Sequence, residues 1–162
     1  MTEWKDEFEK QLEGLGDYWQ QRFDKAKAFF EQYENLLNEI DSACDGPLAT
    51  VGKSQVAVNY YTSDGKQAQQ KLLNITVRVA ERGMSMSPQV GFQNGKSMMR
   101  AIFSVPQGSV VAPRNSIEFL YDNGNWNWAV VGNDNKPGSE FKLEMLGELL
   151  SFALIPKHPN TP

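Results

Sequence analysis

The sequence contains a single cysteine, Cys44, and a single histidine, His158. One cysteine cannot form an internal disulfide, and the same counts exclude metal sites built from several cysteines or histidines. His158 lies in the proline-rich segment "PKHPNTP", where we expect no folded element to hold it for proton transfer. No organised histidine is available to activate Cys44, so we expect a small buried residue at a helix end.

Long hydrophobic runs are also missing from the chain. The run "FALI", at 152–155, is far shorter than the roughly 20 residues that span a bilayer. The first ten residues, "MTEWKDEFEK", are acidic and lack the basic and apolar regions of a signal peptide. The sequence therefore predicts a cytoplasmic protein without membrane contact.

Residues 46–61, "GPLATVGKSQVAVNYY", contain the Gly-Lys-Ser triplet of a phosphate loop but not its spacing. The motif places four residues between its first glycine and the Gly-Lys pair, and a helix follows it. Five residues separate Gly46 from Gly52, and the residues after Ser54 have strand character. We predict no nucleotide or other cofactor site here, and interpret Lys53 as an exposed residue where a turn leads into a strand.

The first 44 residues have the apolar period of an amphipathic helix. The stripe consists of Trp4, Phe8, Leu12, Leu15, Trp19, Phe23, Ala26, Phe30, Tyr33, Leu37 and Ile40. Gly14 and Gly16 interrupt it, which predicts a short helix near 3–13 and a long one near 17–42, with a fused helix as the alternative. We expect the stripe from Trp19 onward to be buried against a sheet.

From residue 50 the apolar period changes to two, which is typical of strands. In "NSIEFLYDNGNWNWAVV" the Asn123-Gly124 dipeptide predicts a two-residue hairpin turn, so paired residue numbers sum to 247. This register places Tyr121 opposite Trp126, Phe119 opposite Trp128 and Ile117 opposite Val130, all on one face.

The order of these elements predicts an α+β fold. We expect an antiparallel sheet of about five strands, with one face covered by the long N-terminal helix and by a C-terminal helix over 140–154. Residues 132–138 have loop composition. Residues 1–155 then form a single domain, and 156–162 form a mobile tail.

The charge is unevenly distributed along the chain. Residues 1–45 carry a net charge of −7 and residues 46–162 a net charge of +3. We interpret this as an acidic helical layer beside a slightly basic sheet. The alternative is an anion site formed by Lys71, Arg78, Arg82, Lys96 and Arg100; nucleic-acid binding is not expected, because such binders have a stronger basic excess.

The element order resembles two broad groups of proteins in architecture. One comprises cone-shaped folds whose helices close over a curved sheet to form a pocket, and the other comprises small acidic bacterial secretion chaperones that dimerise through a sheet. The first resemblance implies a small apolar ligand, bound or turned over by carboxylates. The acids in or near the predicted sheet are Glu81, Glu118, Asp122 and Asp134, and their spacing brings no two of them together. The second resemblance implies a protein partner, and a homodimer is one form that it takes.

Our leading hypothesis is a non-enzymatic interaction protein of the adaptor, chaperone or immunity type, without catalytic residues or bound metal. Its contact surface is expected on an aromatic and methionine-rich part of the sheet, because Trp, Tyr and exposed Met are typical of binding surfaces. Most of the hairpin face is expected to be core, with its tip exposed. The candidate binding residues are Tyr121, Trp126, Tyr61, Met98, Arg78 and Arg100.

Overall fold

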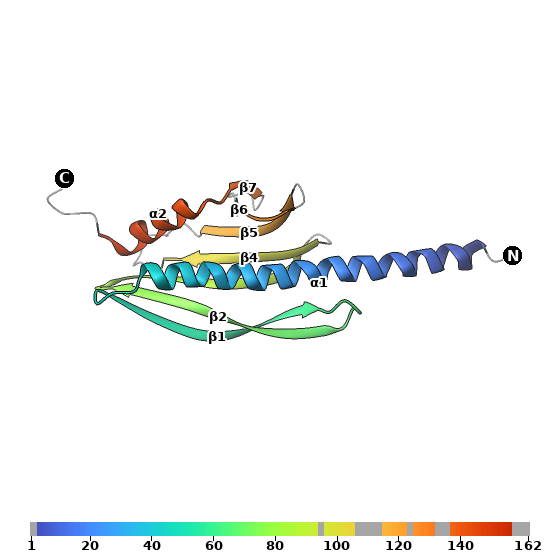
Figure 1. Cartoon of the computed structure of the whole chain (residues 1–162), viewed down its shortest axis with the longest axis horizontal. Helices are drawn as coiled ribbons and strands as arrows, with labels where there is room; N and C mark the ends of the chain where they lie inside the picture. The colour runs from blue at the N-terminus through green and yellow to red at the C-terminus, as the bar shows by residue number, and fades with distance from the viewer. Residues whose placement is uncertain (1–2, 94–95, 106–114, 123–124, 132–136, 157–162) are drawn as a thin grey trace.

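The computed structural model of the chain describes residues 3–93, 96–105, 115–122, 125–131 and 137–156. These residues form two helices and one antiparallel sheet of seven strands in sequential order (Figure 1). The elements are α1 (Glu3–Ala43), β1 (Ala49–Tyr61), β2 (Gln67–Val79), β3 (Arg82–Gln93), β4 (Lys96–Ser104), β5 (Asn115–Asp122), β6 (Asn125–Val131), β7 (Pro137–Glu140) and α2 (Leu143–Leu154). The predicted α+β class is confirmed.

The predicted number of strands, about five, is wrong, because β3 and β7 have little strand character in their sequences. Strand β3 contains Gly83, Pro88 and Gly91, and the four-residue β7 begins at Pro137. Glycine and proline are depleted in strands, so only pairing with neighbouring strands specifies these two. The pairing of β7 with β6 also explains why α2 begins at Leu143 rather than at 140.

Helix α1 is continuous, so the predicted break at Gly14 and Gly16 is absent and the fused alternative is correct. Its C-terminal part packs on one face of the sheet. Phe29 is completely buried, with ring centroids 5.9 Å from Phe119 and 5.7 Å from Trp128. Tyr33 is equally buried, and its hydroxyl donates to the backbone oxygen of Leu73 at 2.6 Å. These contacts join the helix to the middle of the sheet.

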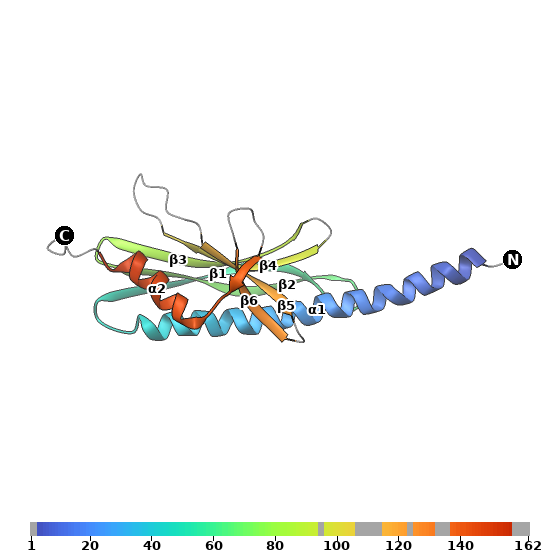
Figure 2. The same ribbon diagram turned by 90° about the horizontal axis from the view of Figure 1, so that it is seen from above.

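Helix α2 lies on the same side of the sheet as α1 (Figure 2). Its Phe152 and Leu149 border Ile117 and Val130, which share the face that carries Phe119 and Trp128. Arg82 of β3 donates to the backbone oxygens of Ala153 and Phe152, at 3.2 and 3.1 Å. These bonds satisfy carbonyls in the last turn of α2, which have no partner within the helix.

The predicted register of the β5–β6 hairpin is confirmed. Tyr121 pairs with Trp126, Phe119 with Trp128 and Ile117 with Val130. The turn itself, Asn123-Gly124, lies outside the described residues, as do the predicted tail from residue 157 and most of the predicted 132–138 loop.

Strands β1 and β2 form a long ribbon that separates from the rest of the sheet. The pairing of β2 with β3 ends at Ile75 and Met86, whereas β1 and β2 stay paired to Tyr61 and Gln67. Pro88 lies in β3 beyond this fork, where its missing N–H removes no bond to β2. In β1 the residues on the core are odd-numbered up to Val51 and even-numbered from Val56, as expected for a strongly twisted ribbon.

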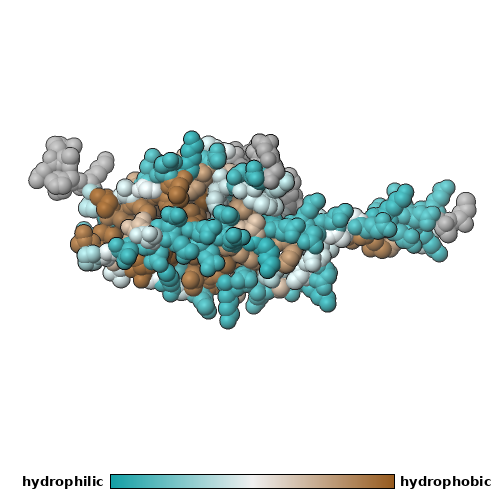
Figure 3. Space-filling view, in the orientation of Figure 1, coloured by the Kyte–Doolittle hydropathy of each residue, from teal (hydrophilic) through white to brown (hydrophobic). Residues whose placement is uncertain are grey.

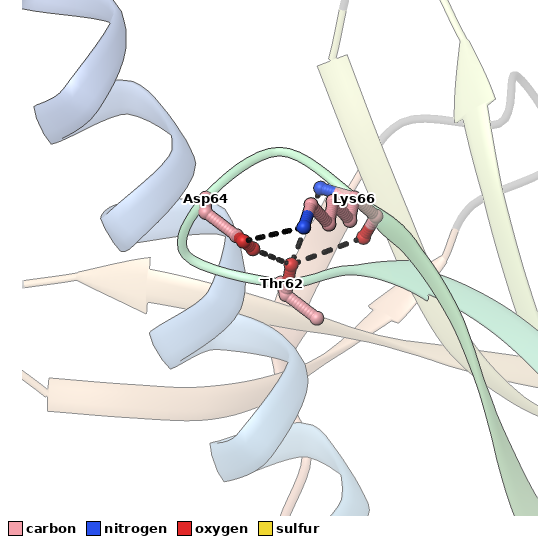
Figure 4. A network of polar contacts seen from close by, with 3 residues as sticks. All are labelled: Thr62, Asp64 and Lys66. Carbon is pink, nitrogen blue, oxygen red and sulfur yellow. Dashed lines mark hydrogen bonds and ion pairs between the residues drawn. The ribbon is translucent and has the colours of Figure 1, made fainter.

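The turn at the tip of this ribbon is fixed by hydrogen bonds of its own. The Thr62 hydroxyl bonds to the Asp64 carboxylate, and Thr62 and Lys66 are further joined through backbone and side chain (Figure 4). Gly65 adopts φ +80°, and a β-carbon at this position would lie 3.0 Å from the indole of Trp19. The ribbon tip therefore contacts α1 where the helix leaves the sheet.

Candidate functional site

Aromatic side chains gather at one end of the sheet. The strands form an antiparallel meander, so the ends of β1, β3 and β5 all lie on one edge. These ends carry Tyr61, Phe92 and Tyr121. Strand β6 begins at the same edge, and Trp126 is its second residue. Helix α1 passes the same edge at Trp19 and Arg22. We call this group, Trp19, Arg22, Tyr61, Phe92, Tyr121 and Trp126, the aromatic end.

The guanidinium of Arg22 is surrounded by rings from three elements. Its central carbon lies 4.8 Å from the ring centroid of Tyr61, 5.0 Å from Phe92 and 5.3 Å from Trp19. Tyr18, one turn earlier, lies at 5.6 Å and accepts a hydrogen bond from Arg22 Nη1 at 3.3 Å. Cation–π contacts of this kind hold a guanidinium in place while leaving its N–H edge able to bind an anion.

No carboxylate of the described residues forms a salt bridge with Arg22. The ion pairs among the described residues are Lys53–Asp41, Lys66–Asp64 and Arg100–Glu118. A cavity of about 180 Å³ adjoins Arg22 in the fork between β2 and β3. Its lining combines the walls of Tyr61 and Phe92 with polar groups of Asn59, Gln67 and Ser97. This volume admits one side chain rather than a drug-sized molecule, which needs roughly 300 Å³ or more.

Lys25 places a second cation beside Arg22. Its ammonium donates to the backbone oxygen of Ser97 at 3.0 Å, which joins α1 to the start of β4. Burial lowers the pKa of Lys25; Glu118 opposes this shift, and Arg22 adds to it. Two cationic side chains, Arg22 and Lys25, therefore lie at this end of the sheet.

The β5–β6 hairpin supplies the other half of the aromatic end. Trp126 stacks on Phe119, with centroids 5.3 Å apart and planes 10° apart. Tyr121 contacts the edge of Trp126 at 4.9 Å and is 62% exposed. The rings deeper in the hairpin, Phe119 and Trp128, pack on α1 instead. The hairpin face is thus core at one end and accessible at its tip.

The first part of α1 extends past the sheet into solvent (Figure 1). We call residues 3–18 the projecting segment. Its apolar stripe is uncovered: Trp4 is 69% exposed, Phe8 53%, Leu12 49% and Leu15 45%. Figure 3 shows apolar surface along one edge of this segment, with polar surface over the rest of that face. Six acidic and two basic residues give the segment a net charge of −4.

Gly14 and Gly16 both lie in the projecting segment. No atom lies within 4 Å of a β-carbon built at either position. Each glycine costs an exposed helix roughly 1 kcal/mol relative to alanine. Because neither residue makes a turn or a close contact within the described part of the chain, their small size is available to a neighbouring molecule.

Three of the six predicted binding residues lie at the aromatic end, and a fourth lies next to it. Tyr61, Tyr121 and Trp126 belong to it by definition, and Met98 lies next to it, paired with Gly91 near the start of β4. The two arginines lie elsewhere. Arg78 is exposed on the other half of β2, where that strand pairs with β3, and Arg100 is only 8% exposed beside Glu118, at 3.8 Å.

The proposed anion patch does not form one surface. Arg82 is engaged by α2, and Arg100 is buried in the sheet. Lys53, expected where a turn meets a strand, lies within β1, where it is exposed and pairs with Asp41 at 2.6 Å. Cys44 is buried beside the end of α1, as expected, and burial raises the pKa of its thiol.

Three larger hollows lie away from the aromatic end. A shallow one, of about 500 Å³, lies on the projecting segment beside Trp4 and Phe8, and its carboxylates, Glu3 and Glu7, are exposed. The other two lie between a helix and the sheet. One, of about 480 Å³, lies between α1 and the β1–β2 ribbon and includes Glu31 and Glu34, both exposed. The other, of about 340 Å³, lies under α2 and is lined mainly by apolar side chains such as Phe103, Phe141 and Phe152. Neither has a buried carboxylate among its lining residues, so neither provides the acid and base that the pocket hypothesis requires.

Sequence reasoning missed Arg22 and Phe92. Arg22 occupies a position on the inner side of α1, one turn after Trp19, where a charged residue is unusual. The signal that could have found it was this charged residue beside the apolar stripe. Phe92 lies in β3, the strand that the sequence did not predict, so its approach to Arg22 could not be foreseen.

No helix in the described ranges is long and apolar enough to cross a membrane. Nor do the described residues bring together three side chains of the kinds that ligate metal ions. A scan against protein-family models, a search of curated proteins and a search of solved structures each found no match. The function of the chain is therefore argued from the aromatic end and the projecting segment.

Proposed function

We propose that this protein is a non-enzymatic interaction protein that binds another polypeptide through its projecting segment and aromatic end. The observation that carries this proposal is the uncovered stripe of Trp4, Phe8, Leu12 and Leu15. A surface helix normally turns such a stripe toward a core, and large exposed apolar patches are typical of interaction sites. We propose the cytoplasm as its location, where an adaptor, a chaperone or an immunity-type partner would act.

The energetics of the projecting segment support a bound state. A helix of about 15 residues is marginal in water even when its sequence favours helix, and two glycines weaken this one. Packing of the stripe against a partner supplies the stabilisation that the sheet supplies to the rest of α1. The free segment is then expected to fray, and the bound segment to remain helical.

The aromatic end extends the same surface. A polypeptide lying along the stripe reaches Trp19, Arg22 and Phe92 at the base of the segment, because the stripe continues to Trp19. Trp, Tyr and Arg are the residues that most often dominate the free energy of protein association. Tyr121 and Trp126, at the same end of the sheet, provide a second contact for the partner.

The alternative, a pocket protein that turns over an apolar ligand, has less support. The three hollows large enough for such a ligand lack a buried carboxylate among their lining residues. The core over the centre of the sheet is filled by rings such as Phe29 and Phe119.

Affinity capture with a matched pair of variants tests this proposal. Leu12→Glu places a charge in the stripe, whereas Gln21→Glu adds the same charge at an exposed position of α1. Tagged wild type and both variants are used to capture polypeptides, including the untagged protein itself, from the native cell extract. We expect wild type and Gln21→Glu to capture one polypeptide in stoichiometric amount, and Leu12→Glu to fail to capture it. Equal capture by all three proteins would contradict the proposal.

A further inference from the structure

We infer that the polypeptide covering the projecting segment is a second copy of this chain, lying antiparallel across a two-fold axis. This inference rests on the proposed function, since it names the partner of the same stripe. A two-fold interface requires a surface that is complementary to itself. The stripe, the length of the segment and the position of Arg22 each meet this requirement.

The stripe has nearly the same order in both directions. It runs Trp4, Phe8, Leu12, Leu15, Trp19, so it begins and ends with tryptophan around smaller apolar side chains. When two copies lie antiparallel with paired numbers summing to about 23, Trp4 meets Trp19 of the second copy and Phe8 meets Leu15. Leu12 then lies near the axis and packs against its own counterpart. Every exposed member of the stripe is covered.

The length of the segment matches the space that this arrangement leaves. Sixteen residues of helix span about 24 Å at 1.5 Å per residue. A second helix on the stripe can extend only until its tip meets the sheet at Trp19 and Tyr61, whose ring centroids are 5.2 Å apart. Two copies satisfy this limit together, because the tip of each helix stops where the other sheet begins.

The charges at the two ends of the segment are opposite. The first turn of α1 is acidic, with Glu3 and Asp6. Asp6 lies on the face away from the stripe, so the arrival of this turn at the aromatic end brings the carboxylate of Glu3 to Arg22. Arg22 is held there by four rings, beside a cavity the size of one side chain. A guanidinium with its planar faces covered binds a carboxylate through its N–H edge. The two-fold axis creates this contact twice.

The remaining acids do not prevent the association. Positions beside the stripe include Gln11, Gly16 and Tyr18, whereas Glu13 and Asp17 lie on other faces of the helix. The acids that this numbering places opposite each other, Asp6 and Asp17, both lie on the face away from the stripe, so the interface does not press like charges together. The net charge of −4 on each segment still repels, and added salt screens this repulsion.

Sedimentation equilibrium measures the association directly. We expect wild type and Gln21→Glu to have twice the monomer mass of 18.3 kDa, and Leu12→Glu to have the monomer mass. A wild type that stays monomeric at all concentrations overturns the inference. If capture in the experiment above then still depends on Leu12, the proposed function stands with a different partner. A dimer unaffected by Leu12→Glu places the interface elsewhere and overturns the inference.

Engineered disulfides test the direction of the helices. In a Cys44→Ala background, which removes the native thiol, Phe8→Cys and Leu15→Cys are prepared separately and mixed. We expect oxidation of the mixture to link Phe8→Cys to Leu15→Cys, while neither variant links to itself, because position 8 lies about 10 Å along the helix from its counterpart. Efficient self-linking of Phe8→Cys would indicate parallel helices and would overturn the antiparallel arrangement.

Discussion

At the scale of single residues, Tyr33 shows how a polar group fits the core between α1 and the sheet. Its ring is fully buried and its hydroxyl donates to the backbone oxygen of Leu73. Burial raises the pKa of the phenol well above its ordinary value, because the charged form would lose hydration without gaining a cation. The position therefore requires a neutral side chain with one donor.

Tyr33→Phe is predicted to cost about 1 kcal/mol of unfolding free energy at neutral pH, since it removes the bond to Leu73. The raised pKa also makes stability depend on pH. The folded protein keeps the phenolic proton while the unfolded chain loses it above about pH 10, so the contribution of Tyr33 is lost as pH rises beyond that value. The unfolding free energy, measured with urea, should decrease less between pH 8 and a pH above 10 in Tyr33→Phe than in wild type. Tyr121→Phe, at an exposed position, should keep the wild-type decrease.

Gly65→Ala is predicted to destabilise the protein by about 1–2 kcal/mol, the cost of a left-handed residue with a β-carbon. Gly65 has φ +80°, and the added carbon would also press on Trp19. Gly52→Ala is the matched control, because its β-carbon meets only the Thr76 oxygen, at 4.0 Å. Thermal unfolding should separate the two variants; equal melting temperatures would show that the ribbon tip is not held against α1.

At the scale of elements, the sequence predicts what is determined locally. The β5–β6 register follows from a turn dipeptide and an alternating pattern that agree with each other, and the observed pairs match the prediction. Strand β3 is different, because Pro88 is compatible with a strand only where β2 has already separated. The location of that fork depends on long-range packing. The cavity beside Arg22 lies in the fork, so it could not be predicted either.

Two tryptophans on the same hairpin are predicted to have different roles. Trp128→Ala should destabilise the fold by about 3–5 kcal/mol, because its ring packs against Phe29 and Phe119. Trp126→Ala should cost less stability and more binding affinity, because Trp126 lies near the tip beside exposed Tyr121. Unfolding and partner-binding measurements on both variants test this division. Equal loss of stability would mean that the whole hairpin is core.

At the scale of the whole molecule, the projecting segment follows from a mismatch of lengths. Helix α1 has 41 residues and so spans roughly 62 Å, whereas the longest strands have 13 residues and span roughly 43 Å. The sheet cannot cover such a helix along its axis. Periodicity marks the whole stripe as apolar but does not show which part the sheet covers. The predicted burial from Trp19 onward is correct from Ala26, whereas Trp19 and Phe23 are only half-buried. The partner of Trp4 and Phe8 could not be predicted.

The most direct test of an interaction surface on the projecting segment is site-specific photo-crosslinking in the cell. A photoreactive amino acid replaces Phe8 on the stripe or, as the control, Lys10 on an exposed face of the same segment. We predict one defined polypeptide adduct from position 8, at the mass of a dimer if the partner is a second copy, and none from position 10. No adduct from position 8, or the same adducts from both positions, would contradict the proposal that a polypeptide covers this stripe.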